Sequence, residues 1–144
     1  MEVLNIDIEQ QLKKLIATTS SDFSALACIK ELDHTIHWKY ATGNSNERFR
    51  HMVGKPGKGI AGSVFRFGRE IVLDQDTVGY DKIRLGYPIM LAENLLAAIA
   101  VPLFANGKIR GVLVTGSRSI RKYTVEEINQ VKETAGYLSS IFNH

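Results

Sequence analysis

Two apolar segments, residues 96–104 and 109–115, are joined by the tetrapeptide Ala105-Asn106-Gly107-Lys108. Asn-Gly readily adopts the positive φ angles that a tight two-residue hairpin turn requires. The two segments are therefore predicted to be antiparallel neighbours, which disfavours a doubly wound parallel sheet. Pro102 has no N–H group to donate to a strand ladder, so it predicts a bulge or a sheet edge at its position.

The first part of the chain predicts one helix and two further strands. Apolar residues recur at helical spacing across residues 8–18, and Asp7 with Gln10 can form a capping box at the start of this helix. Residues 24–30 are apolar on both faces and are predicted to form a central strand. Residues 36–41 alternate between apolar and polar side chains, as in a strand with one buried face.

The clearest helix start in the sequence precedes the last predicted helix. Thr124 and Glu127 have the spacing of a capping box, and Tyr123 with Ile128 can form a hydrophobic staple. The apolar stripe of this helix consists of Val125, Ile128, Val131, Ala135, Leu138 and Phe142.

The middle of the chain is predicted to contain short helices and loops. The predicted order is a short helix near 47–52, a helix at 59–67, a strand at 71–73, a loop at 74–86 and a helix at 88–95. Together with the flanking elements, this order predicts an α+β domain with an antiparallel sheet and a helix at each end.

Length and composition fit one cytoplasmic domain that spans residues 1–144. Cys28 is the only cysteine, which suits a reducing compartment. The N-terminus lacks a signal-peptide pattern, and the longest apolar stretch, residues 95–104, is far shorter than the roughly 20 residues of a membrane span. Lys and Arg total 18 against 15 acidic residues and form no dense stripe. We therefore expect neither membrane nor nucleic-acid binding.

The segment Gly57-Lys58-Gly59-Ile60-Ala61-Gly62 matches the dinucleotide fingerprint G-x-G-x-x-G. A true fingerprint follows a buried parallel strand, and residues 50–56 lack that pattern, so nucleotide binding is disfavoured. Glycines before a helix also leave its first N–H groups open to a ligand, and the helix dipole favours an anion there. Ile60 and Ala61 would present these donors from an apolar wall. The alternative, that the glycines only form a tight turn, stays open.

Residues that could carry catalysis or hold a metal do not form a set. Cys28 has no base nearby in its apolar strand, and buried cysteines are usually inert. His34 and His37 are three residues apart and would point to opposite faces of a strand. Glu93 has no partner that the sequence identifies. We predict no catalytic residue and no metal site.

Two aromatic features can be read either as core or as pocket wall. Trp38, the only tryptophan, is predicted to point inward, where its ring fills the core or lines a cavity. The tripeptide Tyr87-Pro88-Ile89 either packs a loop on a helix or forms a second wall.

Over nearly its full length the sequence resembles the GAF domain family. The resemblance is carried by the glycine-led helix at 57–64, the strands at 98–103 and 109–113, and the helix start at 123–128. It implies a central antiparallel sheet with N- and C-terminal helices on one side, and loops and short helices that enclose a ligand pocket on the other. The Asn-Lys-Phe-Asp-Glu motif of cyclic-nucleotide GAF domains is absent, as is a cysteine in the second half for bilin attachment.

Within this family the sequence resembles the stand-alone GAF proteins that act as nitrate receptors. In these proteins nitrate lies in a largely apolar pocket, and the corresponding residues here are Trp38, Ile60, Ala61, Tyr87, Pro88 and Ile89. The resemblance implies a non-catalytic receptor without a cofactor that regulates a sensor histidine kinase and response regulator for nitrate respiration. It also implies that the terminal helices form the surface for association, either with the partner protein or with a second copy in a homodimer.

Two alternatives stay open. One is a redox enzyme that uses Cys28 and is similar to the free-methionine-sulfoxide reductases, although those enzymes rely on several cysteines. The other is a GAF module that binds a different small metabolite.

Overall fold

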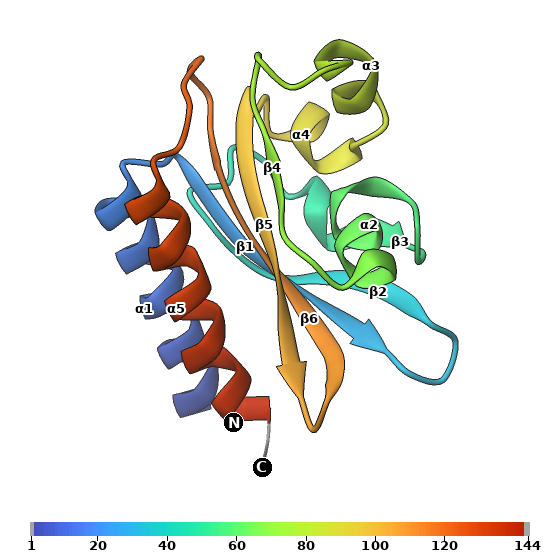
Figure 1. Cartoon of the computed structure of the whole chain (residues 1–144). Helices are drawn as coiled ribbons and strands as arrows, with labels where there is room; N and C mark the ends of the chain where they lie inside the picture. Colours follow the sequence, from blue (N-terminus) through green and yellow to red (C-terminus); the bar gives the residue numbers. More distant parts are fainter. Residues whose placement is uncertain (1, 143–144) are drawn as a thin grey trace.

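Six strands form one antiparallel sheet that divides the molecule into two sides (Figure 1). The strands are β1 (Phe23–Lys30), β2 (Thr35–Thr42), β3 (Val53–Gly54), β4 (Ile71–Leu73), β5 (Ala97–Ala105) and β6 (Lys108–Ser117). Their order in the sheet is β3-β2-β1-β6-β5-β4. The computed structural model describes residues 2–142, with side chains described from Asn5 to Ile141. The predicted α+β fold is confirmed, and the short strand β3 is an element that the sequence did not predict.

Strands β5 and β6 form the hairpin that the Asn-Gly turn predicts. Asn106 and Gly107 have φ angles of 56° and 77°, so both adopt the left-handed conformation that this turn requires. Pro102 pairs with Val112 of β6, whereas β4 pairs with β5 only as far as Ala100. Pro102 therefore lies where β5 forms the edge of the sheet, as expected from its missing N–H group.

Two long helices, α1 (Glu2–Thr19) and α5 (Val125–Phe142), lie side by side on one face of the sheet (Figure 1). They bury Leu12 and Leu138 against strand residues such as Leu26. The predicted stripe of α5 begins one turn later than expected, because the Val125 side chain in the first turn is 69% exposed. The side chain of Phe142 lies outside the described residues.

The predicted start of the first helix is wrong. The helix begins at Glu2, so Asp7 lies inside it rather than at its N-cap. The Asp7 carboxylate instead accepts a hydrogen bond from the Tyr137 hydroxyl of α5 at 2.8 Å. The Asp7 carboxylate, which the local spacing predicted to cap the helix, therefore binds a residue 130 positions away in the chain.

The capping box of α5 is confirmed. The Thr124 N–H donates to Oε1 of Glu127 at 2.8 Å, and the Glu127 N–H donates to Oγ1 of Thr124 at 3.1 Å. Tyr123 is buried in the core on this side, and Ile128 packs against the same cluster. The two residues thus lie as a hydrophobic staple requires.

Short elements cover the opposite face of the sheet (Figure 1). They are a 3₁₀ turn η1 (Arg48–His51) and the helices α2 (Gly59–Phe67), α3 (Tyr80–Leu85) and α4 (Pro88–Ala92). The helix at 59–67 has the predicted bounds, and the short helix predicted near 47–52 is the 3₁₀ turn. None of the described helices has both the length and the apolar content needed to cross a membrane.

The prediction of a loop at 74–86 is wrong over its second half, where α3 forms. The Tyr80 hydroxyl donates to the Leu96 carbonyl, and Nε of Arg84 donates to the Leu95 carbonyl, both at 2.7 Å. These contacts with the segment before β5 stabilise a helix whose own sequence has little apolar periodicity. The next helix, α4, ends at Ala92 and not at residue 95, because Asn94 adopts a left-handed φ of 55°.

Candidate functional site

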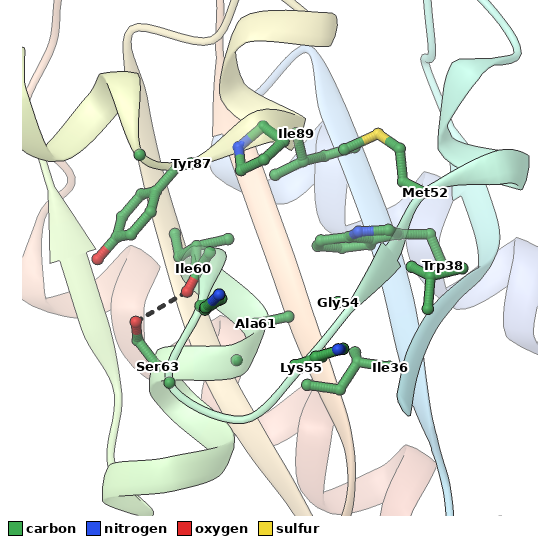
Figure 2. Close-up of a pocket in the computed structure, with 17 residues that line it drawn as sticks. Ile36, Trp38, Met52, Gly54, Lys55, Ile60, Ala61, Ser63, Tyr87 and Ile89 are labelled. Carbon is green, nitrogen blue, oxygen red and sulfur yellow. Dashed lines mark hydrogen bonds between the residues drawn. The ribbon is translucent and has the colours of Figure 1, made fainter. Parts of the chain in front are cut away.

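A cavity of about 720 Å³ lies on the side of the sheet that carries the short helices (Figure 2). It is bounded by β2, the stretch from η1 to β3, the first turn of α2 and the start of α4. Its lining residues are 36, 38, 52–55, 57–63 and 86–89. All six residues predicted to contact a ligand lie in this lining: Trp38, Ile60, Ala61, Tyr87, Pro88 and Ile89. Their contact with a bound anion stays a prediction.

The turn that leads into α2 is formed by Pro56 and Gly57. The Lys58 N–H donates to the Lys55 carbonyl at 3.0 Å, which closes a four-residue turn. Pro56 presets the φ angle of the second position, and Gly57, with φ of 84°, supplies the positive angle of the third. The glycine-rich segment therefore forms a tight turn, which is one of the two alternatives that the sequence left open.

The same segment also leaves the first N–H groups of α2 without a side-chain cap, as the anion-binding interpretation of the glycines requires. Lys58 is the N-cap residue, and its side chain makes no capping hydrogen bond. The N–H groups of Gly59, Ile60 and Ala61 belong to the first turn, where an α-helix has no internal acceptors for them. These donors line the cavity with the positive end of the helix dipole.

Apolar side chains from different elements form the walls. Trp38 of β2 and Ile60 of α2 lie on opposite sides of the space, and Ile89 of α4 lies above it (Figure 2). All three are at most 8% exposed and belong to one hydrophobic cluster. In the described part of the chain the indole N–H of Trp38 donates no hydrogen bond, so it is free to donate to a ligand.

The wall from residues 86–89 is held by the start of α4. Pro88 is the first residue of this helix, where its missing N–H group leaves no hydrogen bond unmade. Tyr87 precedes it as the N-cap residue and is half-buried. The Tyr87 ring lies beside Ile60 (Figure 2), so the two predicted wall segments meet at the cavity.

Two lysines at this cavity were not predicted as site residues. Lys55 and Lys58 line it and are exposed, and neither forms an ion pair within the described residues. No described carboxylate lines the cavity. The positive potential of two lysines therefore adds to that of the helix start, and both favour an anion. The sequence could have indicated these two lysines, because a tight turn at Pro56 and Gly57 brings positions 55 and 58 close together.

The cysteine does not belong to this site. Cys28 packs against the hydrophobic cluster on the helix side of the sheet. Burial raises the pKa of its thiol to about 11, and the nearby positive charge of Lys39 offsets only part of that rise. Its thiol is therefore protonated near neutral pH, the unreactive form for nucleophilic or redox chemistry.

The other candidate groups, the histidine pair and Glu93, lie outside the cavity lining. His37 shares a hydrogen bond of 2.8 Å with Oγ1 of Thr35, while His34 lies in the exposed turn between β1 and β2. No group of three His, Cys, Asp or Glu side chains that could hold a metal occurs among the described residues. Glu93 is fully buried and pairs with Arg118, so the prediction that it has no identifiable partner is corrected by a contact 25 residues along the chain.

Comparisons with known proteins agree with this architecture. The family model described as GAF domain matches residues 7–143. No curated protein matches the sequence significantly.

Two solved structures from Staphylococcus aureus share about a third of their residues with the chain. One is a mutated NreA protein altered in its nitrate-binding site, at 30% identity and a TM-score of 0.76, covering 85% of this chain and 91% of that one. The other is a hypothetical protein, at 32% identity and a TM-score of 0.73, covering 81% of this chain and 97% of that one.

A free methionine-R-sulfoxide reductase from Neisseria meningitidis is similar in fold alone. It has 17% identity and a TM-score of 0.77, with 96% of this chain and 77% of that one covered.

Proposed function

The chain belongs to the GAF domain family, and we propose that it is a non-catalytic receptor that binds nitrate in the cavity beside α2. The proposal rests chiefly on one observation: the uncapped start of α2 opens into an apolar cavity whose charged lining side chains are both lysines. The similarity to NreA at 30% identity supports nitrate as the specific anion.

Nitrate suits such a cavity because it is small, planar, monovalent and weakly hydrated. Backbone N–H donors at a helix start can offset much of the cost of removing it from water. Trp38, Ile60 and Ile89 would then select by size and shape. A divalent anion such as sulfate loses more hydration energy and receives the same few donors, so it should bind more weakly.

The cavity is much larger than one nitrate ion. We therefore expect nitrate to occupy its inner end, between the Trp38 ring and the first turn of α2, with Tyr87 and Pro88 closing over it.

Such closure would shift the populations of the conformations of the segments around the cavity, and a partner protein could detect that shift. We propose a sensor histidine kinase of a two-component system for nitrate respiration as this partner, in the cytoplasm, and a homodimer through α1 and α5.

The volume of about 720 Å³ favours one second candidate, a larger anionic metabolite. Cavities of roughly 300–1,000 Å³ accommodate small organic molecules. The lining would favour a ligand with an acidic group for the start of α2 and an apolar part for Trp38. A redox function through Cys28 has no comparable support, because Cys28 lies on the other side of the sheet.

A thermal-shift screen separates these candidates. Purified, desalted protein is heated with nitrate, nitrite, chloride, sulfate and a set of carboxylic and phosphorylated metabolites. A ligand present at 100 times its Kd stabilises the folded state by about 2.7 kcal/mol, and the melting temperature rises as a result. Stabilisation by nitrate above the other small anions supports the receptor, whereas stabilisation by an organic acid alone would replace nitrate with that ligand.

A further inference from the structure

Glu93 is a fully buried carboxylate that lies outside the cavity. It follows α4 as its C-cap residue, and one of its oxygens, Oε1, accepts three hydrogen bonds. Nη2 of Arg118 donates at 2.6 Å, and the backbone N–H and hydroxyl of Ser45 donate at 2.7 and 3.0 Å. A fully buried carboxylate with this many donors holds its neighbours in one arrangement, because moving them away would leave a buried charge without partners.

Arg118 connects this carboxylate to the sheet and to the loop after β2. It directly follows β6, and its backbone N–H donates to Asp22 at 2.7 Å. Its guanidinium also donates to the backbone carbonyls of Glu93 and Gly43, at 2.8 and 3.0 Å. Asn46 adds a further link, since its side-chain amide donates to the Ala92 carbonyl at 2.8 Å. We call Ser45, Glu93 and Arg118 the clamp.

The clamp joins two chain segments that carry different parts of the cavity lining. Glu93 ends the segment that begins with Tyr87 and Ile89 at the cavity wall. Ser45 begins the segment that passes through η1 to Met52 and Lys55 on another part of the lining. Both segments are therefore fixed, a few residues from the cavity, to the same carboxylate oxygen.

We propose that Glu93 is a positioning residue for the ligand site, which sets the spacing between these two walls without contacting the ligand. The inference rests on the proposed function in so far as nitrate is its probe. When the clamp is intact, the wall at 86–89 and the wall at 52–55 stay at the separation that the bound state requires. When it opens, both walls move, and the fraction of molecules able to bind falls.

The position of the three hydrogen bonds provides a sharp test. All three end on Oε1, while Oε2 is buried and has no partner among the described residues. Glu93→Gln can keep the acceptor oxygen in place, while it removes the charge and puts an amide NH2 group at the position of Oε2. Glu93→Ala removes the acceptor itself. We expect the apparent Kd for nitrate to rise about tenfold or more in Glu93→Ala, because it increases by the factor by which the competent population falls, and to rise much less in Glu93→Gln.

A variant on the other side of the sheet controls for loss of stability. Val131→Ala removes buried volume from α5, far from the clamp, and should lower the melting temperature with no change in the Kd for nitrate. Titration calorimetry gives the Kd for each variant, and hydrogen exchange without ligand gives the mobility of the two wall segments. We expect residues 43–55 and 86–92 to exchange faster together in Glu93→Ala, and neither to do so in Val131→Ala.

Two results would overturn the inference. One is a Glu93→Ala protein that is folded and binds nitrate like the original chain. The other is faster exchange in only one of the two segments, which would show that the clamp does not couple them. If the unaltered chain fails to bind nitrate, the proposed function fails, but the exchange measurement still decides whether the clamp couples the walls.

Discussion

A Cβ atom at Gly62 would lie 2.2 Å from the carbonyl oxygen of Lys55. The first turn of α2 and the preceding turn therefore touch through backbone atoms at this point. Gly57 adds a hydrogen bond to the same place, because its N–H donates to the Gly62 carbonyl at 2.8 Å. The helix start that lines the cavity is thus held by a close approach that only glycine permits.

This contact predicts that Gly62→Ala will disturb the site as well as the fold. The new methyl group must displace the backbone at Lys55, which we expect to destabilise the protein by about 1–3 kcal/mol and to weaken nitrate binding. Gly136→Ala is the matched control, because Gly136 lies in α5 with no atom near its missing Cβ. That change should stabilise the protein by up to about 1 kcal/mol and leave binding unchanged. Chemical denaturation and calorimetry check both; equal effects at the two glycines would contradict the account.

The two lysines at the cavity predict that anion binding depends on salt. In Lys55→Gln/Lys58→Gln we expect the Kd for nitrate to rise about threefold to tenfold at low ionic strength. The difference should nearly vanish at 1 M salt, where the screening length is only about 3 Å. The control Lys13→Gln/Lys14→Gln removes the same charge from exposed positions of α1. Titrations in potassium fluoride at two concentrations give the comparison, and identical salt dependence in both double variants would refute a local role.

The buried thiol predicts slow modification of Cys28. Because its pKa in the folded state is about 11 rather than 9.0, the thiolate fraction at neutral pH is lower by about a hundredfold. The folded state holds this proton more tightly, so stability from this group is complete below pH 9 and is lost as the pH rises from 9 towards 11. Labelling with a thiol reagent at pH 7 should be slow in the folded chain and fast in urea. Rapid labelling of the folded chain would revive a redox role.

Elements with strong local signals were predictable from the sequence. The Asn106-Gly107 turn, the Thr124 capping box and the helix at 59–67 each depend on residues within a few positions of one another. Alternation predicted the buried face of the strand at 36–41 correctly for Ile36 and Trp38. It was wrong for Tyr40, because a shift in the pairing of β1 with β2 turns this side chain to the helix side of the sheet. The six expected site residues came from the family resemblance, and the structure brings all of them to one cavity.

What the sequence did not predict depends on contacts between distant residues. Helix α3 is stabilised by Tyr80 and Arg84 through the carbonyls of Leu96 and Leu95. Glu93 gains its partners from positions 48 and 25 residues away, so no local pattern identifies them. Such tertiary contacts determine which polar groups are available to bind a ligand and which already have hydrogen-bond partners within the chain.

Titration calorimetry of nitrate into the desalted protein decides whether the cavity beside α2 is a nitrate site. We expect saturable binding of about one nitrate per chain, no comparable heat with sulfate or chloride, and loss of binding in Trp38→Ala. Tyr40→Phe is the control on the same strand, because Tyr40 packs on the helix side of the sheet. The absence of nitrate binding by the unaltered chain, or equal affinity in Trp38→Ala, would contradict a nitrate site beside α2.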